Sequence, residues 1–357
     1  MKKKLLVISI GYVATPTPSD KKFVLDIVEN LSDALDISVW TLNDTVANRC
    51  GEEVGHGNNG SYKLYNRNRL FHKPLGSTYK PHPTHSSIRN GLEINLSLLW
   101  YLFTHLRKTI KECKPDVIHL SDSLGPVAGL IKFFYKKIPM TITKPTVRVD
   151  GGLIYKAWIW LSLVNADVIF TFTKSAASQL QKVGLKGEKI SVIPWGVQIP
   201  DEINLAASNK LIRKRYNCDN NDLLVILIPR MIGEELLEYI LHIKEITKKI
   251  KATFVFAIRP TRYEDSFSNA GNDKVIIECG PKDFYDLLFE ADVAIAEVGS
   301  KVGVESTSLL PLAWMESMVR QTPVLTNEGP GVDELLVDSL NGGTYKDDLE
   351  LIEKISE

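Results

Sequence analysis

Residues 283–343 read DFYDLLFEADVAIAEVGSKVGVESTSLLPLAWMESMVRQTPVLTNEGPGVDELLVDSLNGG. A helix-like run ends at Glu290, and the short apolar run ADVAIA follows it. A loop rich in glycine and serine comes next, then an apolar stretch ending in MESM, and then the strand-like PVLTN. Parallel α/β folds bind ligands where such strands end and helices begin. The pattern therefore predicts a phosphate-type ligand site in the second half of the chain.

Similar apolar runs, typical of buried parallel strands, recur along the whole chain. They are KLLVISIG (4–11), DISVWTL (36–42), DVIHL (116–120), LLVILIPR (223–230), ATFVFAI (252–258) and KVIIECG (274–280). Because helix-like runs separate them in two series, we expect an α/β protein with two doubly wound domains. The predicted domains are 1–197 and 210–357, joined by a linker at 198–209. The polar, weakly periodic stretch 44–87 is expected to be a long loop.

Length and composition agree with this organisation. The chain has 357 residues, enough for two ordinary domains, and 44% of them are hydrophobic. The start, MKKKLLVISIGY, resembles a signal peptide, but no small-residue cleavage site follows cleanly, so we interpret it as a first buried strand. The four cysteines are scattered, with no CxxC pair that would indicate a metal or redox centre. A cytoplasmic protein without a metal is the expectation.

The net charge of zero hides a strong split along the chain. Residues 1–199 hold 26 Lys and Arg against 15 Asp and Glu, a balance of +11, and the remainder balances it at −11. A basic half suggests an anionic partner such as a membrane surface, a lipid diphosphate or nucleic acid. Mutual attraction of the two halves across a cleft explains the split equally well.

Three blocks of the sequence resemble the retaining family-4 type of GT-B glycosyltransferases. The first is the order Glu316-Ser317-Met318, Thr322-Pro323-Val324, Gly331 with Glu334, and Asn341-Gly342. The second, 166–197, contains KISVIPWGV, and the third is KPDVIHLSD, 114–122. The resemblance implies two Rossmann-like domains facing a central cleft, with the acceptor on the first and the donor on the second.

The resemblance also implies a reaction and its partners. A sugar would pass from a nucleoside diphosphate donor to a hydroxyl of a glycan, lipid-linked or other acceptor, with retention and without a metal. Because the nucleotide-sugar is a substrate, no cofactor is expected. Nucleic acid is not an expected partner. The location expected is cytoplasmic, with peripheral contact between the basic half and the inner membrane face.

Donor-binding roles follow from the matched positions. Glu316 corresponds to the family's glutamate that binds the ribose hydroxyls, and two carboxylate oxygens suit a vicinal diol. Leu309 and Leu310 stand where backbone N–H groups meet the diphosphate at a helix start. The other donor-binding candidates are Arg230, which matches the family's diphosphate-binding arginine, Arg259, Gly331 and Glu334.

Several positions depart from the family pattern. Ser308 stands where the family has a sugar-contacting glutamate, and Glu305 could substitute for it. Glu235 replaces a lysine that would neutralise phosphate charge, a loss for which Arg259 or Arg262 could compensate. His119 matches the histidine at the end of the family's Asp-x-x-His strand. His119, Glu305 and Ser308 are therefore the catalytic candidates.

The departures leave two other functions open. One is a non-catalytic relative of the same fold that binds a nucleotide, a sugar or a partner subunit. The other is a nucleotide-sugar epimerase, which would change the sugar without needing an acceptor. Turnover separates the three, because a binding module should take up nucleotide without releasing diphosphate.

Overall fold

A computed structural model represents the protein. It describes residues 2–10, 27–28, 30–43, 51–57, 60–68, 95–121, 126–144, 152–197, 199, 211–229, 231, 233–258, 267, 269–279, 284–296, 312–329 and 331–356. All statements about structure refer to these residues. The predicted linker 198–209 lies outside them except for Ile199.

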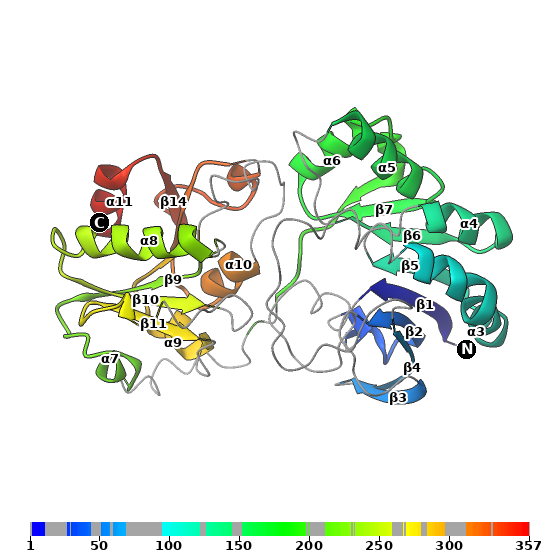
Figure 1. The fold of residues 1–357 in the computed structure, drawn as a ribbon, viewed down its shortest axis with the longest axis horizontal. Coiled ribbons are helices and arrows are strands. Elements are labelled where there is room, and N and C mark those ends of the chain that lie inside the picture. The colour runs from blue at the N-terminus through cyan, green and yellow to red at the C-terminus, as the bar shows by residue number, and fades with distance from the viewer. Residues whose placement is uncertain are drawn as a thin grey trace. The chain divides into compact units, whose positions relative to one another are not determined.

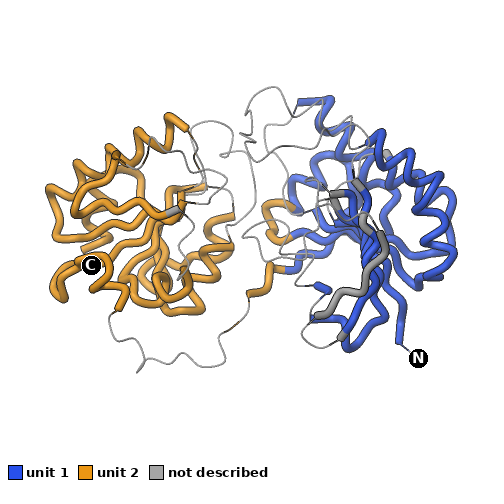
Figure 2. The backbone as a smooth tube through the Cα atoms, turned by 60° about the horizontal axis from the view of Figure 1, so that its bottom comes forward, with its two compact units in different colours: residues 1–171, 177–193 blue, residues 172–176, 194–357 orange. Residues whose placement is uncertain are grey.

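The chain divides into two compact units. Unit 1 comprises residues 1–171 and 177–193, and unit 2 comprises 172–176 and 194–357 (Figure 2). The short segment 172–176 groups with unit 2 although unit 1 surrounds it in the sequence. Nothing in the sequence pattern predicts that exchange.

Unit 1 contains an eight-stranded sheet in the order β3-β4-β2-β1-β5-β6-β7-β8 (Figure 1). Its strands are β1 (Lys3–Ile10), β2 (Leu35–Asn43), β3 (Gly51–Gly57), β4 (Gly60–Asn68), β5 (Val117–Ser121), β6 (Met140–Thr143), β7 (Val168–Thr171) and β8 (Ile190–Val192). All neighbours pair in parallel except β3 and β4. The strand predicted at the start of the chain is thus a central strand of this sheet.

The loop predicted for 44–87 is wrong for its middle part. The antiparallel hairpin of β3 and β4 occupies 51–68 and extends the sheet at its edge. Tyr62 and Leu64 alternate along β4 and are buried in a core that also holds Val39 of β2. This period-two pattern is short and flanked by asparagine and glycine, so the polar composition of the stretch obscured it.

Helices cover unit 1 and supply most of its core. Residues 95–101 are helical and lead into the π-helical turn η1 (Leu102–Leu106) and α3 (Arg107–Cys113). The others are α4 (Pro126–Phe134), α5 (Leu153–Leu163), α6 (Lys174–Lys182), which begins in segment 172–176, and the 3₁₀ turn η2 (Gly187–Lys189). Leucines of 95–113 pack with residues of α4 and α5 against one sheet face. These helices bury about one apolar stripe each, as the 3.6-residue period requires.

Unit 2 contains a six-stranded parallel sheet in the order β11-β10-β9-β12-β13-β14. Its strands are β9 (Leu223–Leu227), β10 (Ala252–Ile258), β11 (Val275–Cys279), β12 (Val293–Ile295), β13 (Val324–Asn327) and β14 (Gly342–Tyr345). Its helices are α7 (Leu211–Arg215), α8 (Gly233–Ile246), α9 (Phe284–Glu290), α10 (Leu312–Met318), the 3₁₀ turn η5 (Val332–Glu334) and α11 (Asp348–Ser356).

Alternate residues of these strands face two different cores. One core combines strand residues with α8 and α11, and the other combines them with α7, α9 and α10. The sheet is therefore the middle of three layers (Figure 1). All seven residues of β10 are buried, because helices cover both faces of the sheet. The predicted class, α/β with two Rossmann-like domains, is confirmed.

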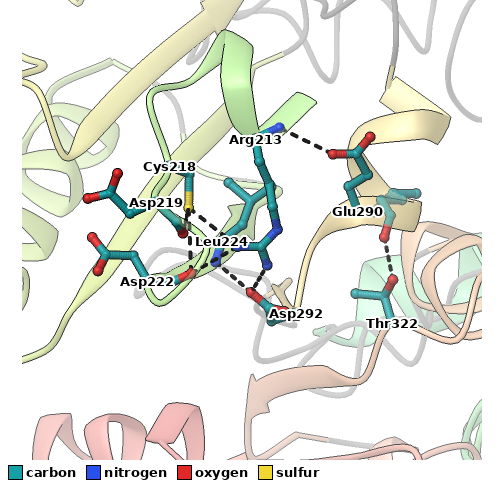
Figure 3. A network of polar contacts seen from close by, with 9 residues as sticks. Arg213, Cys218, Asp219, Asp222, Leu224, Glu290, Asp292 and Thr322 are labelled. Carbon is teal, nitrogen blue, oxygen red and sulfur yellow. Dashed lines mark hydrogen bonds and ion pairs between the residues drawn. The ribbon is translucent and has the colours of Figure 1, made fainter. Parts of the chain in front are cut away.

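A polar network fixes the end of the unit 2 sheet where the strands begin (Figure 3). The Asp292 carboxylate, just before β12, accepts hydrogen bonds from the guanidinium of Arg213 in α7 and from the Leu224 N–H of β9, the latter at 2.7 Å. Arg213 also donates to the Asp222 carbonyl at 2.9 Å, and its own N–H donates to Glu290 of α9 at 3.2 Å. The network joins α7, α9, β9 and β12.

We expect Asp292→Ala to lower the free energy of unfolding by about 2 kcal/mol. Breaking a buried ion pair costs about 3–5 kcal/mol, and an exposed one about 0–1 kcal/mol. The Arg213 side chain is 12% exposed and that of Asp292 35%, so the cost should lie between these limits. Urea unfolding measures it.

Glu245→Gln is the matched control. It removes a carboxylate paired with Lys248 in which both side chains are about two-thirds exposed. Its effect should stay below about 0.5 kcal/mol. Equal effects of the two variants would show that the Asp292 network does not stabilise unit 2.

Candidate functional site

The structure describes four of the ten predicted site residues. They are His119, Glu316, Gly331 and Glu334. The others lie outside the described residues, namely Arg230, Arg259, Glu305, Ser308, Leu309 and Leu310. Their roles stay predictions. The site can be built from Glu316, Gly331 and Glu334, since these three residues belong to unit 2.

Helix α10, which carries Glu316, is held by a buried tryptophan. Trp314 is fully buried in the core beneath the helix. Its indole N–H donates to the Ala296 carbonyl at 2.7 Å, just beyond the end of β12. A buried indole needs such a partner, because an unsatisfied donor would be costly. Trp314 therefore sets the rotation and height of α10 relative to the sheet.

A tyrosine from a second helix contacts the Glu316 carboxylate. Tyr285, in the first turn of α9, donates its hydroxyl hydrogen to Glu316 Oε1 at 3.1 Å. Glu316 is 9% exposed, so its carboxylate is largely withdrawn from water. The contact restrains the side-chain rotation that a free glutamate would have.

Arg320 supports the same arrangement through the face of the tyrosine ring. Its guanidinium carbon lies 4.1 Å from the Tyr285 ring centroid, within the range of a cation–π contact. It also donates to the Glu316 carbonyl at 2.9 Å, at the C-terminal end of α10. A cation there is favourable, because the last carbonyls of a helix carry negative partial charge. Tyr285, Glu316 and Arg320 thus form one interlocked group.

Glu334 binds the beginning of helix α6 within unit 2. Its two carboxylate oxygens accept hydrogen bonds from the N–H groups of Lys174 and Ser175, at 2.5 and 2.7 Å. An anion is stabilised at a helix N-terminus by unpaired N–H groups and the helix dipole. Sequence analysis assigned Glu334 to the donor, which stays a prediction. A donor that uses this carboxylate would compete with the two backbone groups.

Gly331 occupies a position that only glycine tolerates well. Its φ of 83° lies in the left-handed region, where a side chain is strained. A Cβ there would stand 3.4 Å from Glu334 Oε1 and 3.6 Å from the Ser175 Cβ, which is ordinary van der Waals contact. The backbone conformation, and not a lack of space, therefore favours glycine at this position.

His119 is placed as a buried member of β5. The residue is 6% exposed, and its Nδ1 and Nε2 lie 2.8 and 3.2 Å from the hydroxyl oxygens of Thr141 and Thr143. Both ring nitrogens are therefore engaged by the neighbouring strand β6. This geometry favours a structural role, and its predicted part in catalysis is not tested.

Glu234 and Glu235 lie in the first turn of α8, which follows β9. As carboxylates at a helix N-terminus they stabilise α8. A diphosphate bound beside this turn would meet their repulsion. The structure thus gives Glu235 a helix-stabilising role, which differs from the phosphate contact of the family's lysine.

Sequence reasoning missed Tyr285, Trp314 and Arg320. Trp314 could have been suspected, since it lies two residues before Glu316 in an apolar helical run. Tyr285 gives no such signal, because 31 residues separate it from Glu316. Within the described ranges, no group of three or more His, Cys, Asp or Glu could hold a metal ion.

Burial lowers the pKa of His119 from 6.5 to about 4. Between these values the unfolded chain binds a proton that the folded protein does not. The free energy of unfolding should therefore fall as the pH drops from 6.5 to 4, by about 1.4 kcal/mol per pH unit and about 3 kcal/mol in total. Above pH 6.5 this contribution is constant.

Urea unfolding of the wild type and of His119→Gln across this pH range measures the effect. The glutamine does not titrate there, so its curve should be flatter by the stated slope. Parallel curves for the two proteins would show that His119 is not held neutral by the fold.

The first part of the chain matches a known family. Residues 24–199 match the model of Glycosyltransferase Family 4. No curated protein matches the sequence closely enough to count as a relative. No helix in the described part of the chain combines the length and the apolar character that crossing a membrane requires.

Solved structures match over nearly the whole chain. A sucrose-phosphate synthase from Thermosynechococcus elongatus has a TM-score of 0.69 at 14% identity, covering 99% of this chain and 89% of its own. The Anabaena protein HepE, solved with UDP, has a TM-score of 0.62 at 13% identity, covering 99% of this chain and 89% of its own. HepE was also solved with UDP-glucose. A UDP-GlcNAc 2-epimerase from Methanocaldococcus jannaschii has a TM-score of 0.56 at 16% identity, covering 99% of this chain and 92% of its own. At such identities the likeness establishes the fold.

The expectation from the three sequence blocks is confirmed by the family match and by the two parallel α/β units together. Residues 24–199 match Glycosyltransferase Family 4, and the whole chain has the two-domain fold of the GT-B glycosyltransferases.

Proposed function

We propose that the protein transfers a hexose-type sugar from a nucleoside diphosphate donor to an acceptor hydroxyl, with retention and without a metal. The observation that carries the proposal is the restrained carboxylate of Glu316, held by Tyr285 and by the anchored helix α10. Such a carboxylate can accept hydrogen bonds from both hydroxyls of a ribose. The UDP and UDP-glucose complexes of HepE make UDP-glucose the first donor to test.

The chemistry requires help for the leaving group. As the bond between the anomeric carbon and the donor oxygen breaks, negative charge grows on the diphosphate. Arg230 and Arg259, which follow β9 and β10 in the sequence, would stabilise this charge in place of a metal. Backbone N–H groups of Leu309 and Leu310 would add to the effect. Glu305 or Ser308 would contact the sugar, and the acceptor hydroxyl would pass its proton to the departing diphosphate oxygen as its own oxygen bonds to the anomeric carbon.

The acceptor side of the proposal concerns unit 1. We propose a glycan or lipid-linked acceptor, approached by a cytoplasmic enzyme at the inner membrane face. The support is the basic charge of the first half of the chain, 26 Lys and Arg against 15 Asp and Glu in residues 1–199. Anionic lipids attract such a surface.

One observation favours the non-catalytic alternative. Glu234 and Glu235 put two carboxylates into the first turn of α8, where the family brings a lysine to the diphosphate. If they repel the diphosphate strongly, the protein would bind a nucleotide or sugar without turnover. The fold itself does not decide, since an epimerase shares it.

Calorimetry with UDP, and release of UDP from UDP-glucose and other UDP-sugars, test the proposal. Glu316→Ala should weaken UDP binding about 10- to 100-fold, because it removes hydrogen bonds to a charged acceptor worth about 1.5–3 kcal/mol. Glu353→Ala in α11 is the control, a carboxylate on a helix of the opposite layer. Binding without UDP release from any donor would favour the non-catalytic protein. A changed sugar without acceptor would indicate an epimerase.

Tyr285→Phe tests the restraint on Glu316. Loss of one hydrogen bond, worth about 0.5–1.5 kcal/mol, should weaken UDP binding about 3- to 10-fold while the ring and its Arg320 contact remain. Tyr135→Phe, in unit 1, is the matched control and should bind UDP as the wild type does. If Tyr285→Phe also binds UDP normally while Glu316→Ala does not, the tyrosine does not position the carboxylate.

A further inference from the structure

The helical stretch 95–113 has two apolar stripes where one is needed. Leu98, Leu102 and Leu106 are fully buried and fill the core of unit 1. Trp100 and Phe103 belong to a second stripe and are 57% and 52% exposed. A helix at a water-facing surface normally presents polar side chains on that side. The second stripe therefore has no role in the core.

Helix α4 extends this exposed stripe. Phe133, at its C-terminal end, is 63% exposed. The ring of Phe134 lies 5.5 Å from that of Phe133 and 5.8 Å from that of Phe103, both edge-on. The aromatic face, defined as Trp100, Phe103, Phe133 and Phe134, thus spans two helices. Clustered exposed aromatics of this kind indicate an interaction site, whereas single ones do not.

Basic side chains border the aromatic face. The Arg107 guanidinium carbon lies 4.9 Å from the Phe134 ring centroid, and Lys136 Nζ lies 5.2 Å from that of Phe133. The exposed lysines nearby in the sequence are Lys108, Lys111 and Lys137. In 95–113 and 126–144 together, Glu112 is the single acidic residue against seven basic ones, and it pairs with Lys108 at 3.7 Å.

We propose that the aromatic face docks on the surface of an anionic lipid bilayer. The rings would enter the boundary between headgroups and acyl chains, and the lysines and Arg107 would reach the lipid phosphates. Lys136 beside the Phe133 ring, with three more exposed lysines close in the sequence, suits lipid headgroups better than a protein partner, since protein interfaces are poor in lysine. This identifies the surface for the membrane contact proposed above and does not depend on donor binding.

The unequal burial within α4 supports the same conclusion. Val127, Ala128 and Ile131 are buried in the core of unit 1, so α4 already satisfies its packing without the two phenylalanines. The phenylalanines follow at the end of the helix, next to Lys136 and Lys137 in the sequence. The cations would be attracted to an anionic surface, and the rings would add apolar burial.

Co-sedimentation with phosphatidylcholine vesicles, with and without phosphatidylglycerol, tests the proposal at low salt. The wild type should bind the anionic vesicles, and high salt should weaken the binding. Trp100→Ser with Phe103→Ser, and separately Lys136→Glu with Lys137→Glu, should each weaken it at least about tenfold. Leu340→Ser with Leu349→Ser is the apolar control, since both leucines are exposed in unit 2. Lys186→Glu, at an exposed lysine, is the charge control.

Two further measurements keep the outcome clear. Thermal unfolding and UDP binding of all variants should match the wild type, because the substitutions are at exposed positions outside the candidate donor site. Failure to bind anionic vesicles, equal binding to neutral ones, or wild-type binding by both the Trp100–Phe103 and the Lys136–Lys137 variants would overturn the proposal. A change of oligomeric state in the Trp100 and Phe103 variant, measured by light scattering without vesicles, would also overturn it and indicate an interface between copies.

Discussion

The ion pair of Asp292 with Arg213 ties together four elements of unit 2, namely α7, α9, β9 and β12. The hydrogen bonds of the Asp292 carboxylate to an arginine of α7 and to the backbone of β9 fix the point where α9 ends and β12 begins. From there two routes lead to the candidate site. Through α9 the constraint reaches Tyr285, and through β12 it reaches the carbonyl of Ala296, which holds Trp314. The two routes meet at Glu316, which receives a hydrogen bond from the tyrosine and is carried on the helix of the tryptophan. The Asp292 network, at the end of the sheet where the strands begin, is thus connected through α9 and β12 to the position of Glu316 in α10.

Carboxylates serve different physical purposes across this unit. Asp292 is a hydrogen-bond node that stabilises the fold, and Glu334 satisfies the free N–H groups of a helix start. Glu235 stabilises the helix in which it lies. Glu316 differs from these in receiving a hydrogen bond from a side chain of another helix, the Tyr285 hydroxyl. Its predicted contact with the nucleotide would therefore use a carboxylate whose orientation a second side chain restrains.

The sequence predicted the strands well and the site only in part. Buried parallel strands such as β1 and β10 are long apolar runs, so their position follows from composition alone. The hairpin β3–β4 was missed because its few apolar residues alternate among asparagine and glycine. Glu316 was found because its neighbours resemble a family motif. The Tyr285 contact joins residues far apart in the chain, and no local pattern carries that information. His119 shows the converse, since a matching motif gives the residue type but not its burial between two threonines.

The exposed aromatic face and the donor candidates belong to different units with different cores. Neither depends on how the units are placed, because each is built from contacts inside one unit. Substitutions in one should therefore leave the other unchanged, as expected of sites without shared partners. Binding of unit 1 to a membrane would nevertheless affect transfer. A lipid-linked acceptor confined to the same surface as the enzyme is present at a high effective concentration, so modest affinity for the acceptor would suffice. On the proposed function, the excess of positive charge in the first half of the chain would bring enzyme and acceptor together, and the second half, which carries the compensating negative charge, would bind the donor.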